Sequence, residues 1–283
     1  MEMKTGSLLI DKKKGLTSRQ EVNFVSKKLG IKKAGHIGTL DPFADGLLIV
    51  LLGSSTKISP FLEMMDKEYI ATLKLGVKTD SGDLTGNIVE EKEVPLLSKE
   101  KIVEVLKTFK GKQSQLPPMY SAIKVNGKEL YKYARKGEEI ERKAREIEIY
   151  SLDLISFEKD EITFKAHVSK GTYIRTLGED IATRLGTVGH LISLTRTKIG
   201  PYSLKDAKVD DEVSESDLVD ISTMLSYMKS LTLDEKEAKK ALNGMSLKLD
   251  IKDELVLIKD INDVIAIYKK QSNGVYSCLR GLR

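Results

Sequence analysis

The sequence predicts an α+β, or mixed α/β, fold, because patterns typical of helices and of strands are interspersed along its 283 residues. The clearest strand pattern is Glu68–Leu75, where every odd-numbered residue is apolar and the segment has two distinct faces. The clearest helix patterns are the one that follows the capping residue Ser18 and the one that carries Leu177, Ile181 and Leu185 at i+4 spacing. A chain of this length allows one large domain with a small one, or two medium ones.

The first half of the chain predicts alternating strands and helices. Ser18 and Glu21 have the spacing of a capping box, and the helix that they start would end at Gly30. A short apolar run between Gly46 and Gly53 indicates a buried strand. In order, the predicted elements are a strand at Ser7–Asp11, a helix from Ser18 to Gly30, strands at Leu47–Leu52 and Glu68–Leu75, and a helix from Ser98 to Gly111.

The second half contains a polar, basic segment, Lys112–Arg145, and then resumes clear strand and helix patterns. The acidic stretch Asp210–Asp220 has the composition of a loop and indicates that a domain boundary follows it. The predicted elements are strands at Glu146–Ile149 and Ile162–Val168, a helix ending at Gly186, a helix at Asp234–Asn243, and short strands at Leu255–Lys259, Val264–Tyr268 and Gly274–Leu279.

Composition and charge limit the class of protein. The formal net charge is +5 and the pI is near 8.9, which is compatible with a polyanionic partner without requiring one. The single cysteine, Cys278, excludes an internal disulfide and a cysteine-rich zinc site. The N-terminus lacks the apolar core of a signal peptide, and Leu47–Leu52 is too short to span a membrane, so we expect a cytoplasmic protein without a membrane partner.

The most informative stretch joins a glycine-rich polar loop to the apolar run. It contains one histidine, His36, and two carboxylates, Asp41 and Asp45. Pro42 restricts the backbone of Asp41 to extended or turn geometry, so that carboxylate is held on a loop beside a buried strand. From the residues alone two interpretations remain open, because Asp-Pro is also a common way to open a structural turn.

The motif Gly-His-x-Gly-Thr-Leu-Asp-Pro-x-Ala-x-Gly-x-Leu in this stretch resembles the signature of the bacterial tRNA pseudouridine-55 synthases, the TruB-type family. Four further segments match that family in order, although it usually has Pro at the position of Lys13 and a small hydroxyl residue at that of Asp45. These segments are Leu8–Ser18, Asp66–Tyr69, Ser169–Thr176 and Gly189–Arg196. Five ordered matches would not arise by chance.

The resemblance implies a pseudouridine-synthase fold with a mixed, largely antiparallel central sheet flanked by helices. It implies a catalytic domain at residues 1–230 with a thumb insertion at about 112–145 that closes over RNA. It also implies a small PUA-like RNA-binding β-barrel at residues 231–283. The implied activity is isomerisation of a T-loop uridine of tRNA, at position 55, to pseudouridine by base flipping. Such chemistry agrees with the lack of a P-loop or a metal-ligand cluster in the sequence, and we expect no cofactor and no metal.

By the same resemblance, the nucleophile is Asp41, the arginine that pairs with it is Arg175, and the active-site tyrosine is Tyr69. Tyr69 offers a ring to stack on uracil and a hydroxyl that can assist proton removal. Without the family match, a structural salt bridge for Arg175 and a core position for Tyr69 are the favoured interpretations of these residues. The substrate-binding residues implied are His36, Tyr69, Tyr173, Leu194 and Lys12.

The partner implied is the T-arm stem-loop of tRNA, with no obligate protein partner and a monomeric state. Basic residues in Lys112–Arg145 interleave with tyrosines, which suits phosphates and unpaired bases. Its glutamates dilute the charge, so a solvated loop-helix remains open as the alternative. Two other functions remain open as well: an RNA-binding or tRNA-folding protein, and a guide-RNA-dependent rRNA pseudouridine synthase, which should lack the long thumb.

Overall fold

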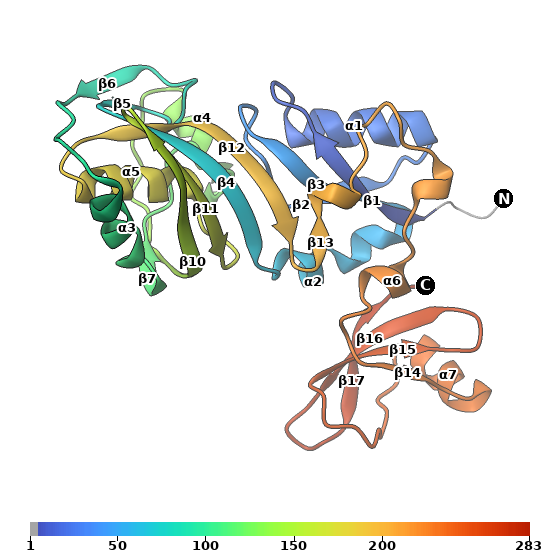
Figure 1. The fold of residues 1–283 in the computed structure, drawn as a ribbon. Coiled ribbons are helices and arrows are strands. Elements are labelled where there is room, and N and C mark those ends of the chain that lie inside the picture. The colour runs from blue at the N-terminus through green and yellow to red at the C-terminus, as the bar shows by residue number, and fades with distance from the viewer. Residues whose placement is uncertain (1–4) are drawn as a thin grey trace.

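The computed structural model describes residues 5–283, so the segment 1–4, on which part of the signal-peptide prediction falls, lies outside it. A nine-stranded sheet dominates one end of the molecule and a four-stranded sheet the other (Figure 1). The strands are β1 (Gly6–Lys12), β2 (Ala34–Ile37), β3 (Asp45–Leu52), β4 (Lys67–Leu75), β5 (Val77–Thr79), β6 (Ile88–Glu91), β7 (Gly111–Gln115), β8 (Lys124–Val125), β9 (Lys128–Glu129), β10 (Arg145–Glu158), β11 (Glu161–Val168), β12 (Gly189–Ile199), β13 (Tyr202–Ser203), β14 (Ser230–Thr232), β15 (Leu255–Lys259), β16 (Val264–Lys270) and β17 (Tyr276–Gly281).

The helices of the described chain are mostly short. They are α1 (Ser18–Leu29), α2 (Ser59–Glu63), α3 (Lys99–Lys107), α4 (Leu130–Ala134), α5 (Ile174–Arg184), α6 (Ile221–Met224) and α7 (Glu235–Leu242), with 3-10 turns at Gly53–Ile58, Leu204–Asp206 and Glu215–Asp217. Across residues 5–283, no helix is long and apolar enough to cross a membrane.

The large sheet has the order β1-β3-β12-β4-β11-β10-β7, with β2 on β3 and β13 on β12. All of these neighbours are antiparallel except β3 and β12, which run parallel and pair at Thr195 with Asp45 and at Arg196 with Gly46. The prediction of an α+β fold with a large mixed sheet is therefore confirmed. The central strand β12 was not predicted as a strand, although it joins the two halves of the sheet.

The first helix begins one residue earlier than the capping-box pattern predicts. Thr17 is the N-cap and forms the box with Gln20, so the prediction of Ser18 with Glu21 is wrong. The Ser18 hydroxyl is engaged elsewhere, because it donates to the carbonyl of Leu40 at 3.1 Å and accepts from its N–H at 2.9 Å. Helix α3 ends at Lys107, and the predicted terminator Gly111 instead starts β7.

Apolar clusters cover both faces of the large sheet. One cluster packs helices α3 and α5 against β4, β10 and β11 and includes Phe109, Phe164 and Leu177. Another joins β3 to the four-stranded sheet through residues such as Leu51, Ile267 and Leu282. The alternation predicted for Glu68–Leu75 is confirmed, because the odd-numbered residues of β4 are buried and its even-numbered residues are partly exposed. These clusters fix the strands whose ends surround the pocket described below.

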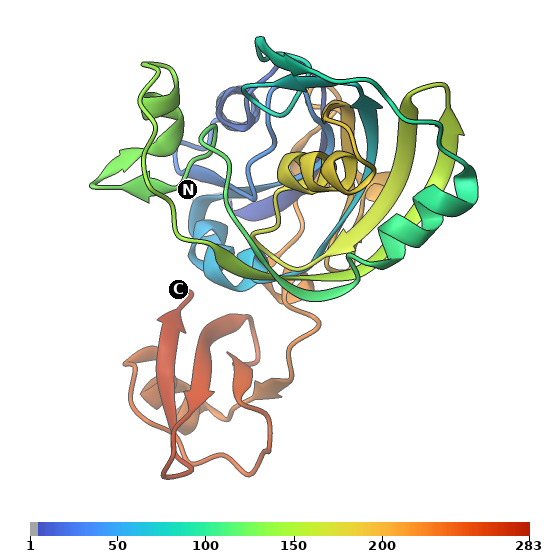
Figure 2. The ribbon, with the colours of Figure 1, turned by 90° about the vertical axis from the view of Figure 1, so that its left-hand side faces the viewer.

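Between β7 and β10 the chain leaves the sheet at residues 116–144. Figure 2 shows this excursion, which carries β8, β9 and α4, standing out from the sheet. Residues 111–115 belong to the sheet as β7, which pairs with the start of β10. The boundaries of a thumb insertion and of the two domains remain predictions.

The C-terminal sheet has the order β14-β15-β16-β17 and is open, because within residues 5–283 its edge strands β14 and β17 do not pair with each other. The prediction of a closed β-barrel is therefore wrong, and four strands flanked by α7 form a layered unit instead. The helix predicted at Asp234–Asn243 is confirmed as α7, and Asp234 is its N-cap. Strand β14 is parallel to β15 and too short and polar to show a strand pattern.

Candidate active site

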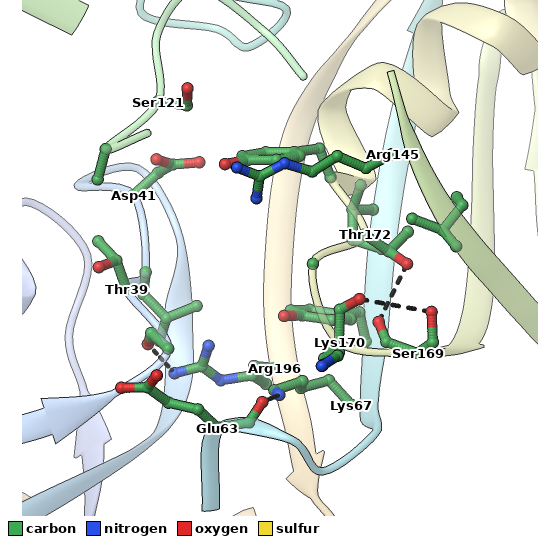
Figure 3. Close-up of a pocket in the computed structure, with 18 of the residues that line it drawn as sticks. Thr39, Asp41, Glu63, Lys67, Ser121, Arg145, Ser169, Lys170, Thr172 and Arg196 are labelled. Atoms are coloured by element: carbon green, nitrogen blue, oxygen red, sulfur yellow. Dashed lines mark hydrogen bonds between the residues drawn. The ribbon is translucent and has the colours of Figure 1, made fainter. Parts of the chain in front are cut away.

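A pocket of about 960 Å³ opens between the two halves of the large sheet. Its walls come from the loop between β2 and β3, from α2, from the adjacent strands β4 and β12, and from the loop that precedes α5. The excursion at residues 116–144 contributes Ser121, Ala122 and Ile123. In Figure 3, Asp41 and Ser121 lie at one end of the pocket, and Glu63, Lys67 and Arg196 lie at the other.

Asp41 and Arg175 form a two-pronged ion pair at this site. The guanidinium Nε lies 2.9 Å from one carboxylate oxygen, and Nη2 donates to the other at 3.3 Å. Arg175 is almost fully buried, whereas 34% of the Asp41 side chain is exposed towards the pocket. The forked guanidinium thus fixes the orientation of the carboxylate from behind and leaves it accessible from the pocket.

The remaining donors of Arg175 are held by the backbone. Its Nη1 donates to the carbonyl of Ser81 and its Nη2 to that of Tyr120, each at 2.7 Å. A second carboxylate, Asp83, lies 3.7 Å from Nη1 and is itself buried. Because three separate segments, the Asp41 loop, the turn at Ser81 and Asp83, and the stretch at Tyr120, meet on one side chain, the position of Arg175 is strongly determined, and so is that of its partner Asp41.

The loop that carries Asp41 is anchored at both ends by Arg196. Its Nη2 donates to the carbonyl of Gly38 at 2.9 Å and its Nε to that of Leu47 at 2.8 Å. Gly46 has a φ of +98°, and a Cβ there would lie 2.5 Å from the Arg196 carbonyl oxygen. Only glycine combines that backbone conformation with so close an approach of β3 and β12.

The turn after β1 supports the same loop from its far side. Lys12 is buried, and its ammonium donates to the carbonyls of Lys13 and Leu16 at 3.0 and 2.8 Å. The N–H of Gly15 then donates to the carbonyl of Pro42 at 2.7 Å. Lys12 is not among the residues that line the pocket, and its contacts stabilise the turn that bonds to the Asp41 loop.

Burial and local charge shift several groups in the pocket. Burial raises the pKa of Asp41 above its ordinary value, Arg175 opposes that increase and Asp83 adds to it. Burial lowers the pKa of His36, and Arg196 lowers it further, so the imidazole is neutral at neutral pH. Burial also lowers the pKa of Lys67 to about 8, with Arg196 as the next contribution. Perturbed groups gathered in one pocket are typical of a functional site.

The structure gathers nearly all of the predicted site residues around this pocket. His36, Tyr69, Tyr173 and Leu194 line it together with the ion pair. Tyr69 and Leu194 project from adjacent strands and are largely buried, so they form apolar walls near the carboxylate. Asp45 turns to Lys14, at 3.6 Å, and is not among the residues that line the pocket.

Three contributors were not predicted from the sequence. Asp83 lies in a turn-forming stretch, Lys67 precedes the tyrosine in the second matching segment, and Arg196 closes the fifth. Lys67 and Arg196 lie within the segments that match the family, so the sequence could have indicated them. Nothing in the local sequence distinguishes Asp83 from an ordinary turn aspartate. Among residues 5–283, no group of three or more His, Cys, Asp or Glu side chains could hold a metal ion.

The fold has known counterparts. A chain in the crystal structure of a Cbf5–Nop10–Gar1 complex superposes with a TM-score of 0.73 at 24% identity, covering 95% of this chain and 79% of that one. A chain in a structure of an H/ACA RNP bound to a substrate RNA containing 2′-deoxyuridine gives a TM-score of 0.74 at 21% identity, with coverage of 99% and 86%. At these identities the likeness shows the fold alone.

Sequence comparison adds the family. A profile described as the N-terminal domain of TruB family pseudouridylate synthase matches residues 26–174. A protein named tRNA pseudouridine synthase B from Hydrogenovibrio crunogenus is 46% identical over 255 residues, covering 89% of this chain and 84% of that protein. The protein of the same name from Geotalea uraniireducens is 40% identical over 296 residues, covering 98% and 96%.

The sequence matches therefore define the class of protein as a pseudouridine synthase, an isomerase. The chain belongs to the TruB family of pseudouridylate synthases, as the motif resemblance predicts.

Proposed function

We propose that this enzyme converts uridine 55 in the T-loop of tRNA to pseudouridine, with Asp41 as the nucleophile. The observation that carries the proposal is the carboxylate of Asp41, oriented by both prongs of Arg175 and open to the pocket. The choice of tRNA is supported by relatives with 40% and 46% identity, both named tRNA pseudouridine synthase B.

The reaction needs a nucleophile and a shaped pocket, and no atoms are gained or lost. The C1′–N1 glycosidic bond of uridine breaks, the uracil rotates, and a C1′–C5 bond forms while the C5 proton moves to nitrogen. Asp41 supports bond cleavage as a carboxylate, and Arg175 keeps it ionised and aligned. The apolar side chains of Tyr69 and Leu194 hold the detached uracil, and burial supports that role for both.

A uridine in a folded RNA must leave its stack to reach Asp41, which costs a few kcal/mol. We assign His36 to the RNA that the flipped base leaves. Its imidazole is neutral, because burial and Arg196 lower its pKa, so it can stack and form hydrogen bonds without carrying charge. Tyr173 borders the same pocket and completes the wall on the side of the α5 loop.

The proposal also divides the chain into regions with different roles. We assign catalysis to residues 1–230 and place the thumb at about 112–145, where it would close over the T-arm. The unit at 231–283 is assigned RNA contact, as an open sheet instead of a barrel. Lys12 acts through the turn that supports the Asp41 loop. The enzyme works as a cytoplasmic monomer without a cofactor in this proposal.

The test incubates the protein with an unmodified tRNA transcript, without any guide RNA, and maps pseudouridine. We expect one product at position 55. The Asp41→Asn variant should bind the tRNA with unchanged affinity and form no product. A wild-type protein that binds tRNA but makes no pseudouridine would favour the alternative of an RNA-folding protein, and activity only with an added guide would favour the guide-dependent class.

A further inference from the structure

The pocket has a second end that the ion pair of Asp41 and Arg175 does not use. Lys67, Lys170 and Arg196 line this end, and Figure 3 shows them on the opposite side from Asp41. They come from the start of β4, from the loop before α5 and from β12, respectively. Three cations from separate elements therefore converge on one half of a cavity that is large for a single uracil.

Lys67 is the best-defined of these cations. Only 7% of the residue is exposed, and its ammonium donates to the carbonyls of Glu63, at 2.9 Å, and Met65. An ammonium group has three N–H donors, so these two bonds leave one for a ligand. The backbone carbonyls hold the nitrogen at the pocket wall, and they neutralise none of its charge.

The charges at this end are poorly balanced. Arg196 lies close enough to Lys67 to contribute, together with burial, to a pKa of about 8, and Lys170 acts in the same direction. The nearby carboxylates Asp66 and Glu63 oppose this shift, so three cations face two carboxylates, and Asp66 also bonds to His167. Like charges held together in a partly dry cavity are relieved when an anion binds between them.

We propose that Lys67, Lys170 and Arg196 form a subsite for one backbone phosphate of the RNA. The proposal rests on the proposed function, because it takes the substrate to be a polynucleotide. Base and phosphate lie on different sides of the ribose, so a nucleotide whose base lies beside Asp41 extends its backbone away from that end. The compact ammonium of Lys67 suits a phosphate oxygen as a point charge.

The competing explanation is that Lys67 only caps the last carbonyls of α2. A binding test separates the two, with Asp41→Asn as the background so that no turnover occurs. The ligands are a T-arm stem-loop RNA and a set of the same RNAs, each with one loop phosphate replaced by an uncharged methylphosphonate. The control variant Lys101→Met removes the same charge from the exposed face of α3, outside the pocket.

Lys67→Met should weaken binding roughly tenfold and lower the slope of log affinity against log salt by about one, as expected for one lost phosphate contact. At one loop position, the methylphosphonate should lower the RNA affinity of the parent, which retains Lys67, by a similar factor. The same replacement should leave the RNA affinity of Lys67→Met unchanged. Lys101→Met should match the parent in both respects, and Lys67→Arg should retain most of the affinity.

An unchanged salt slope in Lys67→Met, or a methylphosphonate effect of equal size with and without Lys67, would show that Lys67 is only a helix cap. Because this readout is binding, it is independent of product formation. Failure of the wild-type enzyme to make pseudouridine would count against the proposed function and leave the phosphate measurement intact.

Discussion

Asp41 and Arg175, which lie 134 positions apart in the sequence, meet in a two-pronged ion pair with N–O distances of 2.9 and 3.3 Å. The pair is already formed in the free protein. Because Arg175 is also bonded to the carbonyls of Ser81 and Tyr120, the carboxylate is positioned before any RNA arrives. Preorganisation of this kind lowers the cost of reaching the transition state.

Replacing Arg175 by lysine should slow catalysis far more than it weakens RNA binding. Lysine keeps a positive charge beside Asp41 but lacks the planar fork of the guanidinium, so it would not fix the orientation of the carboxylate. We expect the single-turnover rate to fall by roughly 100-fold, the usual effect of losing one oriented donor. The measurement is single-turnover pseudouridine formation together with the RNA dissociation constant. A rate within threefold of the wild type would show that the fork is dispensable.

Gly46→Ala should destabilise the protein by about 3 kcal/mol, because alanine is strained at positive φ and its Cβ would overlap the backbone of β12. Gly35→Ala is the matched control, since a Cβ there meets only Thr56 at 4.0 Å. Urea denaturation of both variants gives the comparison. Equal stability of the two variants would mean that β3 and β12 can separate at little cost.

The sequence predicts well those features that depend on local pattern. The strand at Glu68–Leu75, the helix stop at Gly30 and the helix at Asp234–Asn243 follow from local sequence patterns, and the structure confirms them. The motif resemblance predicts that Asp41 and Arg175 meet, which periodicity alone cannot do, because it carries no information about distant contacts.

The failures come from tertiary contacts that override local preference. Ser18 has a capping pattern, but its hydroxyl is taken by the backbone of Leu40, so Thr17 caps α1 instead. The sequence of strand β12 is too mixed in polarity to show a strand pattern. It includes the buried Arg196, whose guanidinium donates to the carbonyls of Gly38 and Leu47. Asp83 joins the site only because a turn distant in sequence folds back onto Arg175.

The excursion at residues 116–144 should be cut by trypsin at Arg135 and Lys136, which are exposed. This excursion bonds to the site through the Tyr120 carbonyl and forms mainly a small hairpin and one short helix, so local opening costs little. If it closes over RNA, saturating T-arm RNA should protect both bonds. Equal cleavage rates with and without RNA would contradict closure.

Glu21 should make the stability of the protein fall as the pH rises through the acidic range. It is buried on α1, and within the described chain neither carboxylate oxygen has a hydrogen-bond partner. Burial raises its pKa from 4.5 to about 7, the charge of Asp210 adds to the increase, and Lys12 and Lys13 oppose it. Between these two pH values the native state keeps a proton that the unfolded chain releases. The free energy of unfolding therefore decreases as the pH increases.

Glu21→Gln removes this dependence and keeps the shape of the side chain. At pH 4, below both pKa values, the variant and the wild type should have similar free energies of unfolding, because Glu21 is then mostly protonated in the native and in the unfolded state. At pH 8 the variant should be more stable by up to about 3 kcal/mol, the free-energy equivalent of the shift in pKa. Urea denaturation at both pH values is the measurement, with the exposed Glu104→Gln as the control. If the stability difference between Glu21→Gln and the wild type is the same at pH 4 and pH 8, the pKa of Glu21 is not raised in the native state.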